Sequence, residues 1–375
     1  MRLKKRLAVL GHACLDITPR IIGQVPRHGK LSIVEPPIWS AGGVVSNTGL
    51  AAAKIGIGTT LVCKIGQDLF GDQLRGLYAY KPNVECCIID SMDPTSFSIV
   101  LVPAKGDRSF LHCPGCNDTF TADDVPYALL TGIDHVHFGY LPIMKALYSD
   151  DGRDAVIMLS RLKSMGKTIS MDMVQVDPRS ETAKQDWEKI LRKVLPFVDI
   201  FTPSFGEMVS IMPCFARYDT GHHGWGMMAN KFLEWGCGAV MLKLGTKGLY
   251  LRTAKDSVIG DSDDWLEREI ISIPFKEETF GSANGSGDVS IAGFLTAMLQ
   301  GLSPELCLQF ANGASSCSVE ALDPLSAVRS WDEIWARIGN GWPLLSDATP
   351  GYSNRSELAG VFHGSEDPKC GPLKD

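Results

Sequence analysis

A run of small residues late in the sequence has the composition of an anion-binding turn. It reads Asn284-Gly285-Ser286-Gly287-Asp288 and is followed by a mostly apolar segment, Val289–Leu299, that predicts a helix. Small residues before a helix let backbone N–H groups face an anion, and the positive end of the helix dipole adds to the attraction. The segment therefore predicts a cradle for a phosphate or an oxyanion.

The carboxylate of Asp288 stands at the mouth of this cradle, where it would repel a phosphate. Such a placement is useful if the carboxylate takes a proton from an attacking hydroxyl while the N–H groups hold the charge on a transferred phosphoryl group. The alternative is an Asp that caps the N-terminus of the helix, which is common. The segment alone does not separate the two roles, because short glycine motifs often occur without function.

Two further segments near the N-terminus complete a pattern. Residues 41–47, with the sequence AGGVVSN, lead into a predicted helix, and residues 64–72, with the sequence KIGQDLFGD, follow a predicted strand. Together with the Gly-Ser-Gly-Asp segment, they resemble the ribokinase-like or PfkB carbohydrate kinase family. The resemblance runs from about Leu7 to Val328. It favours Asp288 as a general base, with the backbone of Gly285, Ser286 and Gly287 at the transferring phosphoryl group.

The resemblance also implies residues that hold the hydroxyl groups of a substrate. They are Asp16, just after the first predicted strand, and Gly42, Gly43 and Asn47 in the Gly-Gly-x-x-x-Asn stretch. Glycine permits a polyol to approach the backbone closely, and an Asn side chain offers both a donor and an acceptor to a diol. The alternatives are a plain tight turn and a solvated loop residue. Arg108, in a turn similar to the family's Gly-Glu-Arg, is implied to face the substrate or its phosphate unless it is an exposed turn arginine.

The same resemblance implies a nucleotide site and a magnesium ligand. Glu207 falls where the family has Asn-x-x-Glu near the water shell of Mg²⁺, and Mg²⁺ prefers to keep several waters. Two positions depart from the family pattern: Ser204 replaces the Asn of that motif, and Ser282 replaces an Asp that commonly helps to hold a monovalent cation. The implied ATP-binding residues are Lys243, Gly245, Thr246, Gly248, Asn284 and Asn312.

The pair Cys113 and Cys116 has the C-x-x-C spacing of redox dithiols and zinc knuckles. A zinc knuckle needs a second ligand pair at matching spacing, and His112 with the vicinal Cys86 and Cys87 does not supply one. We therefore interpret the two thiols as small residues at the edge of the substrate pocket, with a redox switch as the alternative.

Composition excludes several classes of protein. The 375 residues are 45% hydrophobic and 21% charged, as in ordinary globular proteins, and 36 basic against 43 acidic residues give a formal charge of −7. Such a chain lacks the broad positive field of a nucleic-acid-binding protein. Eleven cysteines are too sparse for a disulfide scaffold, and the first apolar run, Leu7–Leu10, is too short for a signal peptide. We expect a cytoplasmic protein without a membrane segment.

Short apolar runs alternate with helix-length segments along the whole chain. This alternation predicts βαβ units around a mostly parallel sheet, with helices on both faces. The predicted strands are Leu7–Leu10, Thr60–Ile65, Asp134–Phe138, Thr168–Met171, Val198–Phe201 and Ala239–Leu244. The predicted helices are Val45–Lys54, Asp154–Ser164, Ala183–Val194 and Met227–Trp235.

Two segments, at about residues 17–40 and 95–118, interrupt this rhythm and predict antiparallel ribbons that form a small lid. With the resemblance, the fold class is a ribokinase-like three-layer α/β/α domain over residues 1–345, with a β-sheet lid and a polar, solvated tail at residues 346–375. A free lid edge can pair with a second lid, so a homodimer is plausible.

The expected activity is transfer of the γ-phosphoryl group of ATP, with Mg²⁺, to a hydroxyl of a sugar or a sugar-like alcohol. A nucleoside kinase of the same fold is the first alternative. A degenerate kinase that binds a sugar or a nucleotide as a regulator is the second, and Ser204 and Ser282 are its sequence support.

Overall fold

The computed structural model describes residues 5–21, 28–102, 109–219, 221–257, 259, 262–346 and 354–369. Arg108 and the predicted lid turn at residues 105–107 lie outside these ranges. In the described ranges, no helix has the length and apolar character needed to cross a membrane. The ten cysteines described are all free thiols.

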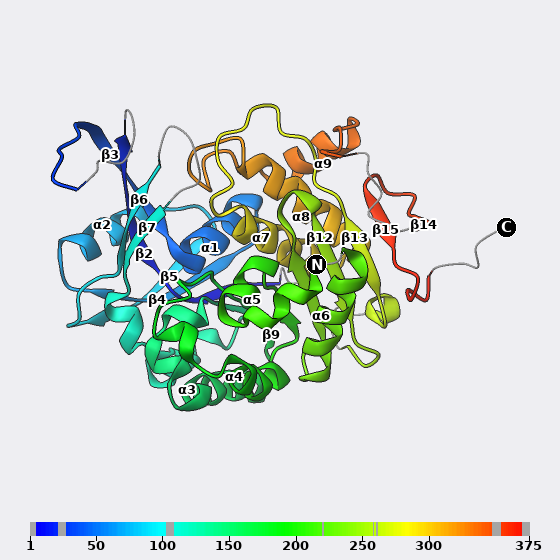
Figure 1. The fold of residues 1–375 in the computed structure, drawn as a ribbon, viewed down its shortest axis with the longest axis horizontal. Helices are drawn as coiled ribbons and strands as arrows, with labels where there is room; N and C mark the ends of the chain where they lie inside the picture. The colour runs from blue at the N-terminus through cyan, green and yellow to red at the C-terminus, as the bar shows by residue number, and fades with distance from the viewer. Residues whose placement is uncertain are drawn as a thin grey trace.

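A large sheet runs through the centre of the molecule (Figure 1). Its parallel part has the order β5-β4-β1-β8-β9-β10-β11. From β1 the chain moves outward in one direction through β4 and β5, and then in the other direction from β8 onward, so the direction switches between β1 and β8. The bounds are β1 (Leu7–Gly11), β4 (Thr59–Gly66), β5 (Val84–Ser91), β8 (His135–Gly139), β9 (Thr168–Asp172), β10 (Ile200–Phe201) and β11 (Ala239–Lys243).

Alternate residues of the buried strands point to opposite faces of this sheet, because the side-chain period of a strand is two. In β1, Ala8 and Leu10 belong to a core that α3, α4, α5 and α6 cover, whereas Leu7 and Val9 belong to a core under α1, α2, α7, α8 and α9. This is the three-layer α/β/α fold that the sequence predicts. The helices are α1 (Gly43–Ile55), α2 (Leu69–Tyr78), α3 (Lys145–Ser164), α4 (Trp187–Val194), α5 (Phe205–Ile211), α6 (His222–Glu234), α7 (Ser286–Leu299), α8 (Pro304–Ser318) and α9 (Trp331–Gly339).

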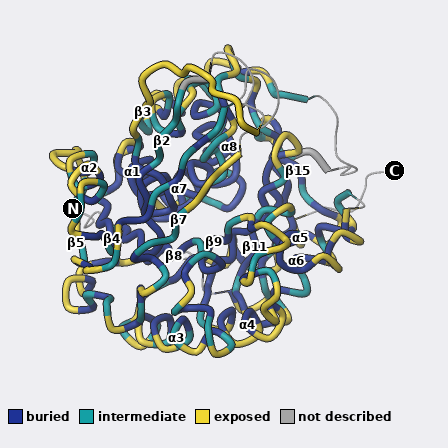
Figure 2. The backbone as a smooth tube through the Cα atoms, turned by 60° about the vertical axis from the view of Figure 1, so that its left-hand side comes forward, coloured by how far each residue is buried: buried dark blue, intermediate teal, exposed yellow. Residues whose placement is uncertain are grey.

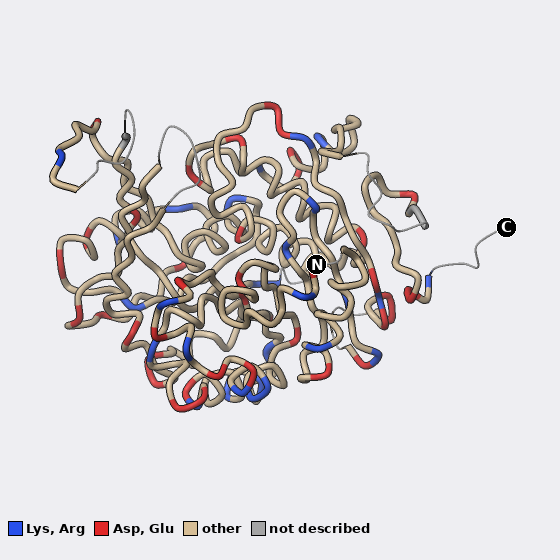
Figure 3. The backbone as a smooth tube through the Cα atoms, in the orientation of Figure 1, with Lys and Arg blue, Asp and Glu red and all other residues tan. Residues whose placement is uncertain are grey.

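Burial and charge follow the three layers. Figure 2 shows α7 as a buried element near the centre, and every residue of α7 from Asp288 onward is buried. Figure 3 shows acidic and basic residues mixed along the outer turns of α3 and α4. Asp288, at the start of α7, belongs instead to the smaller set of charged residues that are buried.

A smaller sheet of four strands has the order β3-β2-β6-β7 and forms the predicted lid. Its strands are β2 (Cys14–Ile21), β3 (Val34–Gly42), β6 (Phe97–Leu101) and β7 (Ser109–Cys113). Apolar side chains on these strands remain exposed, among them Ile38, Trp39, Phe110 and Leu111.

The region after Trp342 differs from the predicted solvated tail. Its described part adds two antiparallel strands, β15 (Val361–His363) and β14 (Asn354–Arg355), beyond β12 (Leu249–Thr253) and β13 (Glu269–Ser272) at one end of the large sheet. The sequence of this region does not predict strands, because its apolar residues are few and scattered among polar ones, yet Val361 and Phe362 are buried.

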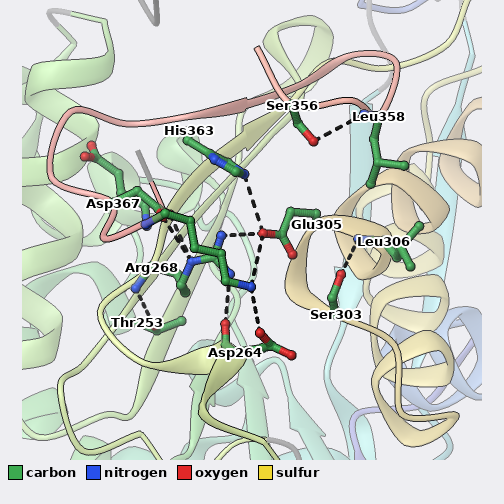
Figure 4. A network of polar contacts seen from close by, with 12 residues as sticks. Thr253, Asp264, Arg268, Ser303, Glu305, Leu306, Ser356, Leu358, His363 and Asp367 are labelled. Carbon is green, nitrogen blue, oxygen red and sulfur yellow. Dashed lines mark hydrogen bonds and ion pairs between the residues drawn. The ribbon is translucent and has the colours of Figure 1, made fainter. Parts of the chain in front are cut away.

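A buried arginine fixes this segment to the body of the protein (Figure 4). The Nε of Arg268 donates to Asp367 at 3.0 Å, and its Nη2 donates to Glu305 of α8. Arg268 and Asp367 are 1% and 3% exposed, so both charges depend on each other for compensation.

Candidate active site

Several polar residues, some of them predicted and some not, lie at the carboxyl ends of the parallel strands and at the start of α7, and one of them lies at the switch between β1 and β8. Ligands bind at this position in open α/β sheets because two neighbouring connections leave the sheet in opposite directions there. Asp172 ends β9, Lys243 ends β11, and Tyr140 directly follows β8. Asp288 enters from the first turn of α7.

Asp288 is buried and does not cap its helix. The N-cap of α7 is Gly285, in the left-handed region at φ 68°, and it makes no side-chain cap hydrogen bond. The Asp288 carboxylate instead accepts hydrogen bonds from the Asn47 amide at 2.9 Å and from the Tyr140 hydroxyl at 2.8 and 3.0 Å. The capping role is therefore wrong, and the carboxylate is held from two other elements.

A buried ammonium group compensates several acids around Asp288. The Lys243 Nζ lies 2.5 Å from Asp172 and 3.5 Å from Glu207. Burial alone would lower the pKa of Lys243, but Asp172, Glu207 and Asp288 outweigh it and raise that pKa above its usual value. Lys243 therefore stays charged.

Burial and the charge of Lys243 also act in opposite directions on the pKa values of the acids. Burial raises the pKa of Asp288, of Glu207 and, more strongly, of Asp172, and the attraction of Lys243 offsets only part of this effect. Three carboxylates share one ammonium, so the cluster carries an excess of negative charge when all are ionised. It can accept either a proton or a cation.

The donor set around this cluster fits Mg²⁺. Oδ2 of Asp172 is buried and has no hydrogen-bond partner among the described residues. Glu207 is less free, because its Oε2 accepts from the Ser204 backbone N–H at 2.6 Å in a capping box at the start of α5. Carboxylate oxygens and an excess of negative charge are what Mg²⁺ prefers, and the role of Glu207 through water stays a prediction.

Asn47 joins the predicted base to the substrate side. Its Nδ2 is committed to Asp288, whereas its Oδ1 is buried without a hydrogen-bond partner in the described part of the chain. That oxygen can accept from a hydroxyl group. Asn47 lies on α1, at whose start the two predicted glycines stand.

Both glycines are required by side chains that press on the backbone. A Cβ on Gly42 would overlap the Asp16 carboxylate, and one on Gly43, at φ 82°, would lie 2.6 Å from the His12 ring. Asp16 belongs to lid strand β2 and pairs with Ser40 of β3. The sequence predicts that a polyol approaches the backbone closely here, and in the structure the side chains of Asp16 and His12 make such an approach.

The backbone cradle is present with one modification. Residues 286–288 form the first turn of α7, whose N–H groups have no partner within the helix. Ser286 N–H donates to the Ala283 carbonyl at 3.3 Å, so it is partly used. Gly287 packs on Lys243, because a Cβ there would lie 3.3 Å from Lys243 Cδ.

Among the predicted nucleotide-binding residues, three lie in or beside the turn after β11 and one lies on α8. Gly245 and Gly248 flank a turn after β11 with φ values of 59° and 96°, and Thr246 of this turn lines a cavity of about 620 Å³ with Trp225, Lys247, Ile273 and Leu345. Asn312 is buried on α8, and its amide donates to the backbone and hydroxyl oxygens of Ser272 at 2.8 and 2.9 Å. It anchors α8 to β13, and its contact with a nucleotide stays a prediction.

Asn284 and Ser282 form the turn before α7, where the Asn284 N–H donates to the Ser282 hydroxyl at 3.0 Å.

Cys116 is buried, and its thiol donates to the Lys64 carbonyl at 3.2 Å. Burial raises the pKa of Cys116, which opposes the thiolate that a redox switch needs.

Sequence reasoning missed Tyr140 and Asp172. Each lies at the end of a strand that the sequence does predict, and Asp172 is the first charged residue after the apolar run of β9. A polar residue at the carboxyl end of a parallel strand was the available signal.

Comparisons with known proteins show what the chain is similar to. The profile of the family described as pfkB family carbohydrate kinase matches residues 4–329. An uncharacterized sugar kinase of Archaeoglobus fulgidus is 24% identical over 72% of this chain and 95% of its own length. A nucleoside kinase of Methanothermobacter thermautotrophicus is 24% identical over 84% of this chain and 89% of its own.

Among solved structures, Arabidopsis thaliana ribokinase in complex with ribose and ATP superposes with a TM-score of 0.70 and 20% identity, over 89% of this chain and 98% of that one. This likeness confirms the fold class.

Proposed function

We propose, for a chain that belongs to the PfkB family of carbohydrate kinases, that Asp288 is the general base that activates a hydroxyl of a sugar or sugar-like acceptor. The chain is an ATP-dependent carbohydrate kinase by family. The observation that carries the finer proposal is the buried Asp288 carboxylate, oriented by Asn47 and Tyr140 at the start of α7.

In the proposed reaction, the acceptor O–H gives its proton to the Asp288 carboxylate. The acceptor oxygen forms a bond to the γ-phosphorus of ATP while the bond from that phosphorus to the β–γ bridging oxygen breaks, and ADP leaves with the electron pair. Charge spreads over the equatorial oxygens of the transferred group. The N–H groups of Gly285 and Gly287 and the ammonium of Lys243 are suited to stabilise it.

Burial, the charge of Lys243 and two hydrogen bonds act together on the pKa of the base. Burial raises the pKa of Asp288, but the bonds from Asn47 and Tyr140 favour its charged form. Burial and the negative charge of Asp288 raise the pKa of Tyr140 well above its usual value, so the phenol remains a donor. The two hydrogen bonds therefore favour the ionised base and fix the orientation of its carboxylate.

Mg²⁺, when bound with ATP, neutralises charge between the β- and γ-phosphates. We assign Asp172 and Glu207 as the residues that would hold it, because Oδ2 of Asp172 has no hydrogen-bond partner among the described residues and Glu207 lies 3.5 Å from the same ammonium. Lys243 keeps these acids from repelling one another.

On the acceptor side we propose Asp16 and the free Oδ1 of Asn47 as hydroxyl-binding groups. Arg108, outside the described residues, stays a candidate for the same pocket. A nucleoside acceptor remains the second candidate, since the nucleoside kinase relative matches as much of the chain as a sugar kinase does. The intact Asp288 site argues against a regulator without activity.

The test combines a substrate panel with one variant. ADP release is measured with sugars, polyols and nucleosides, for the wild type and for Asp288→Asn, and ATP affinity is measured by calorimetry. We expect turnover with one acceptor class, and a kcat lower by about 10²–10⁴-fold in Asp288→Asn with unchanged ATP affinity. Wild-type turnover by the variant would refute the role of Asp288, and ATP binding without turnover on any acceptor would favour the regulator.

We further propose that the exposed apolar face of the lid pairs with the lid of a second copy. Trp39 and Leu111 lie on the same face of the lid, because Ile17 and Ile99 pair between them, and they are 41% and 59% exposed. An open sheet edge with apolar side chains favours such pairing.

A further inference from the structure

Two histidine rings connect the lid to the main sheet. His12 follows β1 and is buried, whereas His112 lies on lid strand β7. Their Nε2 atoms lie 3.3 Å apart, and the ring centroids are 5.0 Å apart. Burial lowers the pKa of both rings, that of His112 to about 4, so both are neutral at pH 7.

A thiol completes the group. Cys14 is buried on β2, and one ligand atom from each of His12, Cys14 and His112 lies within 4.8 Å of the other two. The Cys14 Sγ also lies 3.3 Å from a carboxylate oxygen of Asp16. Two imidazole nitrogens, a thiol and a nearby carboxylate are the donor types of zinc sites.

The surroundings hold these donors in place. The Asn117 side chain, fully buried, is hydrogen-bonded to both the N–H and the carbonyl of Ala13, at 3.4 and 2.9 Å, between His12 and Cys14. Ser98 lies 3.0 Å from Nδ1 of His112. When the Nδ1–H of His112 donates to the Ser98 hydroxyl, Nε2 keeps its lone pair, as in histidines that bind metals.

We propose that Nε2 of His12, Sγ of Cys14 and Nε2 of His112 bind a Zn²⁺-type divalent ion at the junction of the lid and the main sheet. In a tetrahedral site, two zinc-bound nitrogens are about 3.4 Å apart, close to the distance between the two rings. A bound nitrogen and sulfur are about 3.6 Å apart, so the thiol completes the site by a small side-chain movement.

Binding of the ion displaces the proton of the Cys14 thiol to solvent, and the neutral histidines release none. One proton therefore leaves per ion. The soft donors select Zn²⁺ or Co²⁺ over Mg²⁺, which separates this site from the acids around Lys243.

The competing explanation is a single N–H···N hydrogen bond between two neutral rings, with no affinity for metal. It predicts the same ring distance but no role for Cys14. A measurement of metal binding that distinguishes the thiol from the imidazoles therefore separates the two explanations.

The experiment uses the full chain, freed of metal with a chelator and titrated with Co²⁺ and with Zn²⁺ in competition with a chromophoric chelator. We expect one ion per chain, with the visible absorption of tetrahedral Co²⁺ and a thiolate-to-cobalt charge-transfer band. Cys14→Ala should remove the charge-transfer band, and His112→Gln should weaken Zn²⁺ binding by at least about 100-fold.

Two variants serve as matched controls. Cys113→Ser changes a thiol next to His112 whose side chain points to the other face of β7, and His223→Gln changes an exposed histidine on α6. Both should bind Co²⁺ as the wild type does, and thermal unfolding without metal checks that each variant is folded.

Absence of a charge-transfer band in the wild type, or equal Zn²⁺ affinity in the wild type and His112→Gln, would overturn the proposal. Because the readout is metal binding and not phosphoryl transfer, its failure would leave the proposed kinase mechanism untouched.

Discussion

The hydroxyl of Tyr140 contacts both oxygens of the Asp288 carboxylate, from a residue held at φ 68° directly after β8. A non-glycine residue in this left-handed region is uncommon and is kept there only by its surroundings. Here the surroundings place a phenol on the predicted catalytic base. Tyr140 is therefore a positioning residue for Asp288.

Tyr140→Phe should move the acidic limb of the pH profile of kcat to higher pH. The phenol stabilises the charged carboxylate, so its loss raises the pKa of Asp288, and a base with a higher pKa becomes active only at higher pH. A hydrogen bond to a charged group contributes about 1.5–3 kcal/mol, which corresponds to a shift of about one to two pH units. Tyr148→Phe, on α3, is the control, and an unmoved limb in Tyr140→Phe would contradict the positioning role.

Lys243→Met should destabilise the fold most at high pH. It leaves Asp172, Glu207 and Asp288 buried without the ammonium, at a cost of about 3–5 kcal/mol. The pKa values of these acids are already raised, and groups with raised pKa values lose their contribution to stability as pH rises through the folded value.

Urea unfolding from pH 4 to pH 8 measures this effect, and the difference from the wild type should shrink toward the acidic end. The double variant Lys243→Met/Asp172→Asn removes one of the repelling charges and should recover part of the loss. A deficit independent of pH would point to lost packing instead.

Asp367→Ala should destabilise the protein by about 3–5 kcal/mol, because it leaves the buried Arg268 without one of its two carboxylate partners. Arg179→Ala is the control, because it breaks an ion pair in which Arg179 is 90% exposed and which contributes about 0–1 kcal/mol. The measurement is the free energy of unfolding in urea at pH 7. Equal effects of the two substitutions would mean that the C-terminal strands are not coupled to the fold through this arginine.

Trp39→Glu combined with Leu111→Glu should convert a lid-paired dimer to a monomer. Both side chains are exposed on the lid, and charge on both copies would make the paired faces repel each other. Light scattering at several concentrations gives the mass. A wild type that is monomeric throughout, or a dimer that survives both substitutions, would refute pairing through this face.

Much of the site could be predicted because its parts are local. Gly285, Asp288 and Asn47 occur in motifs whose spacing has a physical reason, and the structure brings the side chains of Asn47 and Asp288 within 2.9 Å. Buried strands such as β1 and β11 could also be predicted, because a short apolar run bounded by turn residues favours a buried strand.

The rest depended on contacts between distant residues. His12 and His112 are separated by 100 positions, and only the pairing of the lid strands brings them together. Tyr140 carries no motif, since its role comes from the backbone turn after β8. The strand β15 is three residues long and is recognisable only from its pairing with β13.

The hydrogen bond between Arg268 and Asp367 joins residues that are 99 positions apart, so Asp367 is synthesised well after Arg268. A ribosome adds about 5–20 residues per second, so roughly 5–20 s separate the synthesis of the arginine from that of its partner. During that interval one edge of β13 is unpaired, and the Arg268 guanidinium lacks the Asp367 carboxylate. The nascent protein is then most exposed to wrong strand pairing, and chaperones would have most to protect.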